Sequence, residues 1–290
     1  MHANTQISNG DDASVHILNK NEALVVSTDT AVAGVHWPRD FPLDQAADRA
    51  VCAALSDLAA MGAKACWAWV SVVAESAESL EMMGTGVTDA LNRYDVELSG
   101  GDTVQAPCQI LNITVAGMLK HGTAMQRNQA EMTDKVWLIG KLGFSSLGLQ
   151  QWFSGKHTGS FVPYFREIHP KLEQGEYLRK IGIRCCIDVS DGVLQDAGHI
   201  AKASNIGMEL ELSKFPGWKK MADQVGVKHA QQAMLSGGED YALLFTAPAH
   251  MTWLSPFACC IGECTEGDGV EVKLHDEAVL CTQVGYKHFD

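Results

Sequence analysis

Short apolar runs recur along the chain and alternate with stretches of helical period. Each run has five to ten residues, is rich in branched and aromatic side chains, and is bounded by polar or Gly-containing segments. This pattern is typical of strands with at least one buried face. The predicted strands span residues 23–27, 67–74, 109–118, 135–139, 185–189 and 241–247.

Two stretches between these runs have the apolar spacing of helices. Leu43 to Gly62 has Asp44 as a candidate N-cap and Gly62 as a candidate C-cap, and a second helical pattern covers residues 191–204. Strands that alternate with helices predict a mixed α/β fold. The polar segment 120–134 has little apolar period, so it predicts a boundary between two domains, 1–131 and 132–290.

Composition narrows the functional classes. The chain has 290 residues, of which 46% are hydrophobic, enough for two ordinary cores. Its apolar runs are shorter than the roughly 20 residues of a membrane helix, and its first residues lack the apolar core of a signal peptide, so we expect a cytoplasmic protein. Nine scattered cysteines without a CxxC pair indicate reduced thiols and no zinc site.

The net charge of −13 disfavours nucleic acid as a partner. A negative protein can still bind a polyphosphate when a divalent metal ion lies between the two sets of charges. This makes the position of the acidic residues the informative feature of the sequence.

Acidic residues occur in five places that merit attention, and in three of them the acid directly follows an apolar strand or a Gly-Gly turn. Open α/β sheets collect ligands at such places. Each acid taken alone is more often a turn or cap residue, but five such places together favour magnesium ligands, because hard oxygen donors without paired cysteines select magnesium. The acids are Asp11, Asp12, Asp29, Asp57, Asp102, Asp188 and Asp191.

Asp57 lies on a predicted helix face that otherwise carries small residues, namely Ala46, Ala50, Ala53 and Ala60. Either a neighbouring element approaches this face closely, or the alanine face is solvated. The pattern alone favours neither alternative.

A Gly-Gly turn precedes Asp102 and would let backbone N–H groups approach a phosphate. The Walker loop and the protein-kinase signatures are absent, so ATP would be bound in another way. The segments 98–103 and 235–241 both read Leu-Ser-Gly-Gly-acid, which hints at related halves.

Seven motifs occur in an order that resembles the thiamine-monophosphate kinase family. This family belongs to a superfamily with aminoimidazole ribonucleotide synthetase and selenophosphate synthetase. The motifs cover the chain from Gly10 almost to its end. They are GDDAS from Gly10, VVSTDTAVAGVHW from Val25, LSDLAAMGA from Leu55, SGGDT from Ser99, IDVSDGVLQDAGHIAKAS from Ile187, LSGGEDYALLFT from Leu235 and GYKHF from Gly285.

The resemblance implies direct phosphoryl transfer from ATP to thiamine monophosphate, without a phosphoenzyme. It implies a two-domain synthetase-like fold in which the N-terminal mixed sheet pairs across a homodimer, a C-terminal α/β domain follows, and ATP binds between the domains. Rival hypotheses are another ATP-dependent synthetase of the superfamily and a non-catalytic nucleotide-binding dimer.

The resemblance also assigns roles to individual residues. The implied magnesium ligands are Asp12, Ser27, Thr28, Asp29, Asp57, Asp102, Asp188 and Asp191. The implied ATP contacts are Gly101, Asp102, Arg127 and Ser190. The implied contacts to thiamine monophosphate are His36, Glu239 and Tyr286, and the acids expected to matter most for catalysis are Asp29, Asp102 and Asp191.

Three of these roles have a simpler alternative. His36 in its loop is typical of a packing residue, Tyr286 of C-terminal packing, and Glu239 of the end of a strand. The chain also departs from the family pattern: only nine residues precede Gly10, and the stretch 128–134 lacks the Gly and Pro-Gly expected there.

Overall fold

The computed structural model describes residues 4–279 and Gly285. Contacts divide the chain into two compact units, each with its own sheet. Unit 1 comprises Met1–Ala124 and Arg166–Tyr177, and unit 2 comprises Met125–Phe165 and Leu178–Asp290. In the described part of the chain, no helix combines the length and apolar character needed to cross a bilayer.

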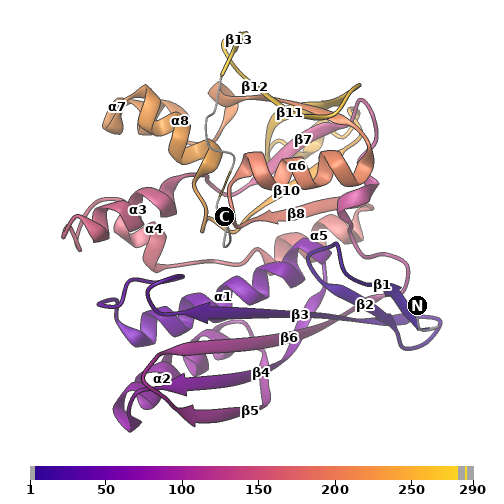
Figure 1. Ribbon diagram of the computed structural model, residues 1–290. Coiled ribbons are helices and arrows are strands. Elements are labelled where there is room, and N and C mark those ends of the chain that lie inside the picture. Colours follow the sequence, from indigo (N-terminus) through magenta and orange to yellow (C-terminus); the bar gives the residue numbers. More distant parts are fainter. Residues whose placement is uncertain (1–3, 280–284, 286–290) are drawn as a thin grey trace. The chain divides into compact units, whose positions relative to one another are not determined.

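Unit 1 is built on a six-stranded sheet with the order β1-β2-β3-β6-β4-β5 (Figure 1). Its pairs are antiparallel except β4 and β5, which run parallel. The strands are β1 (Thr5–Ile7), β2 (Ser14–Ile17), β3 (Glu22–Val32), β4 (Lys64–Ala74), β5 (Glu97–Gln105) and β6 (Ile110–Lys120).

Helices α1 (Leu43–Met61) and α2 (Ala77–Arg93) pack on this sheet. The predicted C-cap of α1 is confirmed, because Gly62 has φ 71°, a left-handed conformation that glycine adopts at low cost. The predicted N-cap is wrong. The cap position is Pro42, which makes no side-chain cap hydrogen bond, and Asp44 lies in the first turn, where its charge still favours the helix dipole.

The sheet face opposite the helices is open in the single chain. Trp69 is 40% and Val104 is 52% exposed. Thr28 Oγ1 and Thr114 Oγ1 lie 3.0 Å apart on the same face. An open face of this kind mixes apolar and hydroxyl side chains.

Unit 2 contains a seven-stranded sheet with the order β13-β12-β9-β11-β7-β10-β8 (Figure 1). Only β9 and β12 run parallel. Two of these strands have the bounds predicted from the sequence, residues 135–139 and 185–189. The strands are β7 (Lys135–Ile139), β8 (Cys185–Val189), β9 (Gly207–Glu211), β10 (Ala242–Ala247), β11 (Cys259–Thr265), β12 (Gly269–Leu274) and β13 (Glu277–Ala278).

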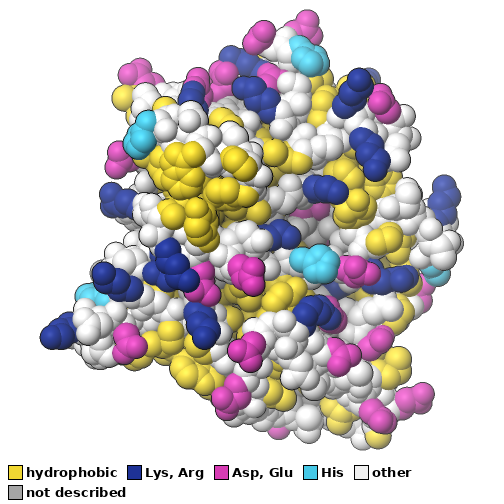
Figure 2. Space-filling view, turned by 180° about the vertical axis from the view of Figure 1, so that it is seen from behind, with side chains coloured by type: hydrophobic (Ala, Val, Ile, Leu, Met, Phe, Trp, Pro, Cys, Tyr) yellow, Lys and Arg dark blue, Asp and Glu magenta, His cyan; other side chains and the backbone are white. Residues whose placement is uncertain are grey.

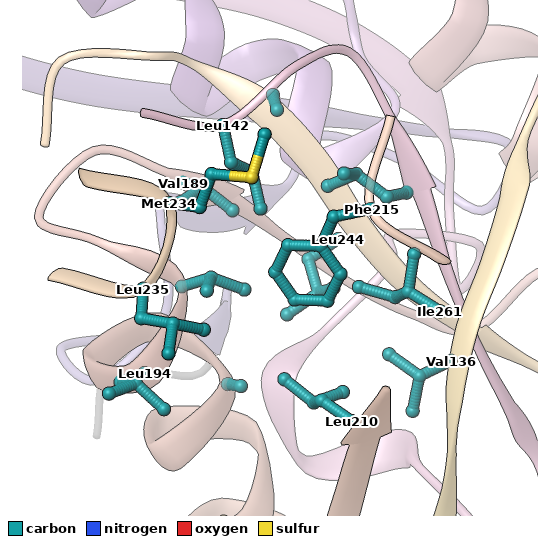
Figure 3. Close-up of a cluster of buried hydrophobic side chains, with 14 of the residues drawn as sticks. Val136, Leu142, Val189, Leu194, Leu210, Phe215, Met234, Leu235, Leu244 and Ile261 are labelled. Atoms are coloured by element: carbon teal, nitrogen blue, oxygen red, sulfur yellow. The ribbon is translucent and has the colours of Figure 1, made fainter. Parts of the chain in front are cut away.

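Buried side chains of β7, β10 and β11 face those of α6 and α8 in the core of unit 2 (Figure 3). Each fully buried aliphatic side chain stabilises the fold by about 1.5–3 kcal/mol, so this core holds α6 and α8 against the sheet. The helical segments of unit 2 are η1 (Arg127–Gln129), α3 (Phe144–Phe153), α6 (Val193–Ser204), η2 (Leu212–Lys214), α7 (Trp218–Val225), α8 (Val227–Ser236) and η3 (Thr252–Leu254). The chain passes between the units after Ala124 and again at α4 (Val162–Arg166) and α5 (Leu172–Lys180).

Candidate functional site

Two carboxylates and a hydroxyl meet in unit 1. Ser27 Oγ lies 2.5 Å from Asp57 Oδ2 and 3.3 Å from the backbone carbonyl oxygen of Asp12. A carboxylate oxygen of Asp12 lies within 4.8 Å of one of Asp57, although Asp12 is only 8% exposed. Two carboxylates this close repel each other unless a cation lies between them. The donors are hard oxygens, the ligand type that magnesium prefers, so the residues fit a magnesium ion.

Helix α1 brings Asp57 to this position. Ala46 is 1%, Ala50 is 6% and Ala60 is 0% exposed. Ala53, the fourth alanine of this face, is half-buried. Three of the four alanines are thus packed, which contradicts a solvated face. Small side chains let the helix lie close to the sheet, and this closeness brings Asp57 within hydrogen-bonding distance of Ser27 on β3.

Strand β3 runs to Val32, five residues beyond the predicted end at residue 27. Ser27 and Asp29 therefore lie inside a strand, on one face and about 6.6 Å apart along it. Thr28 points to the opposite face, where it contacts Thr114. Its hydroxyl therefore lies on the other side of the sheet from Asp57.

Asp102 lies far from this group within unit 1. It is on β5, three strands away from Asp29 on β3, which corresponds to about 14 Å across the sheet. Residues paired across neighbouring strands form a row from Asp29 on β3 to Gly101 on β5, and Asp102 lies one residue beyond the end of this row. That row consists of Asp29, Ile113, Val70 and Gly101.

Asp102 also lies on the open face of the sheet. Its register partner Ser71 alternates with Val70 and Val72, which are buried on the helix side, so Ser71 and Asp102 point to the opposite face. The side chain is exposed, and its Oδ1 accepts a hydrogen bond of 2.8 Å from the backbone N–H of Thr103. Unit 1 of one chain thus brings together Asp12, Ser27 and Asp57 but does not bring Asp102 to them.

Gly101 before Asp102 is required by packing. A Cβ at this position would lie 1.9 Å from the backbone oxygen of Val70, a distance that no side chain tolerates. The sequence pattern predicted this glycine for phosphate approach, and in the structure it permits close pairing of β5 with β4.

His36 follows β3 in a turn whose hydrogen bonds define its ring. Nδ1 accepts a hydrogen bond of 3.0 Å from the backbone N–H of Val32, and the backbone N–H of His36 donates to the carbonyl of Val32 at 2.9 Å. Because Nδ1 is an acceptor, the proton of the neutral ring resides on Nε2. The turn therefore presents an N–H donor at the tip of the ring.

In unit 2, Asp188 and Asp191 lie at the end of β8. Asp188 is 4% exposed. Its neighbours Ile187 and Val189 belong to the core on the α6 side of the sheet, so the side chain of Asp188 faces the other side. Asp191 follows in the turn before α6, and its Oδ2 accepts a hydrogen bond of 2.9 Å from Gln195 Nε2. Gln195 was not among the predicted site residues.

Asp196, the third acid of this motif, has a local structural role. It is 4% exposed, and its Oδ2 accepts a hydrogen bond of 3.2 Å from the backbone N–H of Asp191. Gly192 has φ 115°, a conformation open to glycine, which allows the tight turn between Asp191 and the helix.

The loop before β10 lies directly on this turn. The backbone N–H of Glu239 donates to the carbonyl of Ser190 at 2.7 Å, and that of Tyr241 donates to the carbonyl of Val189 at 2.8 Å. A Cβ on Gly238 would lie 2.5 Å from the carbonyl oxygen of Ser190. Glu239 thus belongs to a loop that precedes a strand, and the alternative that it ends one is wrong.

Arg127 lies in η1, and α6 holds this segment through Ser204. Ser204 Oγ donates to the carbonyl of Arg127 at 2.9 Å and accepts from the backbone N–H of Ala130 at 3.1 Å. The thiol of Cys185 lies 3.7 Å from the same carbonyl oxygen of Arg127. Ser204, another residue that sequence reasoning missed, therefore fixes the backbone that carries Arg127.

The C-terminal segment reaches the same turn at Gly285. A Cβ at this residue would lie 2.5 Å from Gln195 Oε1 and 2.9 Å from the carbonyl oxygen of Asp191. Tyr286, the predicted substrate contact, lies outside the described residues.

Asp240 is a further acid that sequence reasoning missed. Its Oδ2 accepts a hydrogen bond of 2.5 Å from the backbone N–H of Gly143, and its Oδ1 accepts one of 3.0 Å from that of Ser145. Burial raises the pKa of Asp240 to about 7, although these two N–H groups oppose the shift. The only signal in the sequence is its position next to Glu239.

Charges are mixed on the surface. On the face shown in Figure 2, Lys and Arg side chains of the described residues are interspersed with Asp and Glu. That face thus carries no continuous basic surface of the kind that nucleic acids require.

Comparisons with known proteins agree with this architecture. Residues 10–119 match the family model AIR synthase related protein, N-terminal domain. The thiamine-monophosphate kinase of Escherichia coli K12 is 33% identical over 300 residues, which cover 97% of this chain and 91% of that protein.

Two solved structures extend the similarity to the fold. The thiamine-monophosphate kinase of Stenotrophomonas maltophilia is 30% identical, with a TM-score of 0.82 over 96% of this chain and 93% of the other. The structure described as AaThiL complexed with AMPPCP and TMP is 25% identical, with a TM-score of 0.83 over 93% of this chain and 90% of the other. These similarities confirm the predicted α/β synthetase-like fold.

Proposed function

Because the chain belongs to the thiamine-monophosphate kinase family, we propose that it converts thiamine monophosphate and ATP into thiamine diphosphate and ADP. The observation that carries the proposal is the oxygen cluster of Asp12, Ser27 and Asp57 in a chain similar to these kinases over almost its whole length.

In the proposed step, a phosphate oxygen of thiamine monophosphate attacks the γ-phosphorus of ATP. The new P–O bond forms while the bond from the γ-phosphorus to the β–γ bridging oxygen breaks, and that oxygen leaves with ADP. A phosphate monoester has a second pKa of about 6, so the attacking oxygen needs no general base at neutral pH. Positioning and neutralisation of charge therefore supply most of the catalysis.

We propose magnesium as the metal ion. When bound, it neutralises negative charge on the phosphates of ATP. Asp12, Ser27 and Asp57 would hold it in unit 1, and Thr28 would contribute a backbone oxygen. The remaining proposed ligands are Asp29, Asp102, Asp188 and Asp191.

The substrate contacts follow the same proposal. His36 would donate from Nε2 to the phosphate of thiamine monophosphate, because its Nδ1 is already an acceptor. Glu239 would face the cationic ring of that substrate, and Tyr286 would pack on it. The ATP contacts would be Gly101, Asp102, Arg127 and Ser190.

We also propose that the protein is a cytoplasmic homodimer that pairs through the open face of the unit 1 sheet. Exposed Trp69 and Val104 support this, because a face with large apolar side chains favours association. Analytical ultracentrifugation should give a dimer for the wild type and a monomer for Trp69→Glu. A wild-type monomer at micromolar concentration would contradict the proposal.

The direct test is incubation of the protein with Mg²⁺, ATP and thiamine monophosphate, followed by identification of the product by mass. Thiamine diphosphate and ADP in equal amounts are expected, with none when Mg²⁺ or the protein is left out. ADP release with formylglycinamidine ribonucleotide instead would indicate a related synthetase. Calorimetric binding of ATP without any product would indicate a non-catalytic nucleotide-binding protein.

A further inference from the structure

The loop that carries Glu239 has an unfavourable backbone conformation. Glu239 has φ 70° and Tyr241 has φ 50°, and neither is a glycine. A left-handed conformation costs about 1–2 kcal/mol for such residues, so surrounding contacts must hold the loop in place.

Asp240, between these two residues, links the loop to α3. Its two carboxylate oxygens accept hydrogen bonds from Gly143 and Ser145 at the start of α3. The first N–H groups of a helix lack partners within the helix and carry partial positive charge, so they suit a carboxylate. The side chain thus anchors the middle of the loop to α3.

The two neighbours of Asp240 are held by the last residue of β8 and the residue that follows it. Glu239 and Tyr241 donate their backbone N–H groups to Ser190 and Val189. Tyr241 Oη also donates to Glu239 Oε2 at 3.4 Å. Backbone and side chain of Glu239 are therefore both fixed, provided that Asp240 keeps the loop in place.

We propose that Asp240 is a positioning residue that holds the Glu239 carboxylate in place for thiamine monophosphate, with Tyr241 as its second support. The inference rests on the proposed function. Of the two substrates, only thiamine monophosphate carries a permanent positive charge, on its thiazolium ring. Displacement of the Glu239 carboxylate therefore affects this substrate more than ATP.

The test compares Asp240→Asn with a matched control, Asp134→Asn. Asp134 is 8% exposed and accepts hydrogen bonds of 3.1 Å from Thr246 Oγ1 and from the backbone N–H of Glu131, so it is also an anchoring carboxylate of unit 2. It lies at the start of β7, where it is close to the end of β10 opposite Asp240. A general loss of stability would affect both variants alike.

Steady-state kinetics should separate the substrates. Asp240→Asn should raise the KM for thiamine monophosphate at least about tenfold and change the KM for ATP less than about twofold, and Tyr241→Phe should raise the former about threefold. Asp134→Asn should leave both values within about twofold. Equal effects on both substrates, or no effect, would overturn the proposal. If Asp240→Asn does not fold, Tyr241→Phe decides.

Hydrogen exchange tests the anchor independently of catalysis. The amides of Glu239 and Tyr241 should exchange at least about tenfold faster in Asp240→Asn than in the wild type, and at the wild-type rate in Asp134→Asn. Unchanged exchange in Asp240→Asn would overturn the anchoring role. An inactive wild type with this exchange pattern would overturn the proposed function and leave the anchor intact.

Discussion

Two segments of the chain share the sequence Leu-Ser-Gly-Gly-acid and have different structures. The first, residues 98–103, lies within the exposed edge strand β5. There the Asp102 carboxylate accepts a hydrogen bond from the backbone N–H of its neighbour Thr103. The second, residues 235–241, ends α8 and forms the loop before the buried strand β10. Its motif acid is Glu239, and the next residue, Asp240, accepts hydrogen bonds from the backbone at the start of α3.

The difference shows that the flanking residues decide the role of such a motif. The second segment is followed by Ala242–Ala247, which is buried at all six positions, whereas every residue of β5 is at least partly exposed. The buried strand draws its preceding loop into the fold, and there Asp240, the residue after the motif, accepts hydrogen bonds from backbone N–H groups. Asp102 on the exposed strand faces solvent and remains accessible to a ligand.

The largest effect is expected at the turn on which the second segment packs. Asp191→Asn should lower turnover at least about 100-fold, or about 2.7 kcal/mol, because a proposed metal ligand loses its charge. The melting temperature should stay close to that of the wild type. Asp268→Asn, an exposed acid, is the control. Turnover within about tenfold of the wild type would contradict the role of Asp191.

The exposed acid should affect activity without affecting stability. Asp102→Asn should lower turnover more than about tenfold, while the free energy of unfolding in urea changes by less than about 0.5 kcal/mol, because the side chain is exposed. If Asp102→Asn lost stability and kept full activity, Asp102 would have a structural role, and its proposed role in ligand binding would be wrong.

Asp240, which follows the motif of the second segment, should make stability depend on pH. Its pKa is raised to about 7 by burial, above the usual value of 3.8 in the unfolded chain. Between these values the folded state holds a proton that the unfolded state has released, so the free energy of unfolding decreases as pH rises. Relative to Asp240→Asn, the wild type should lose at least about 1 kcal/mol between about pH 5 and 7. Urea denaturation at several pH values measures this, and a constant difference would contradict the raised pKa.

The smallest effect concerns the support of Arg127. Ser204→Ala removes the hydroxyl that holds the Arg127 carbonyl and should raise the KM for ATP about threefold, with the KM for thiamine monophosphate unchanged. Ser154→Ala, which removes an exposed hydroxyl bonded to Gln151, is the matched control. An equal rise in the KM for ATP in Ser204→Ala and Ser154→Ala would contradict the proposed role of Ser204.

The sequence predicted the elements that a hydrophobic pattern defines. Strands β7 and β8 are continuous apolar runs and have the predicted bounds, and α1 ends at Gly62 as its pattern indicated. Strand β5 was not predicted, because an exposed strand that contains two glycines has no apolar alternation.

The site was predicted only in part for a related reason. Motifs indicated Asp12, Ser27 and Asp57 one by one, but their approach depends on how closely α1 packs on β3. Asp240 and Ser204 act through contacts with residues that are distant in the chain, and nothing in their immediate surroundings in the sequence indicates these partners.

The place of Gly285 against Asp191 and Gln195 has a practical consequence for preparing the enzyme. An affinity tag appended after Asp290 begins six residues later, at most about 22 Å of extended chain from this glycine. A polyhistidine tag there would offer imidazole ligands to the same divalent ions that the proposed site needs. Metal titrations are therefore best made with the tag removed.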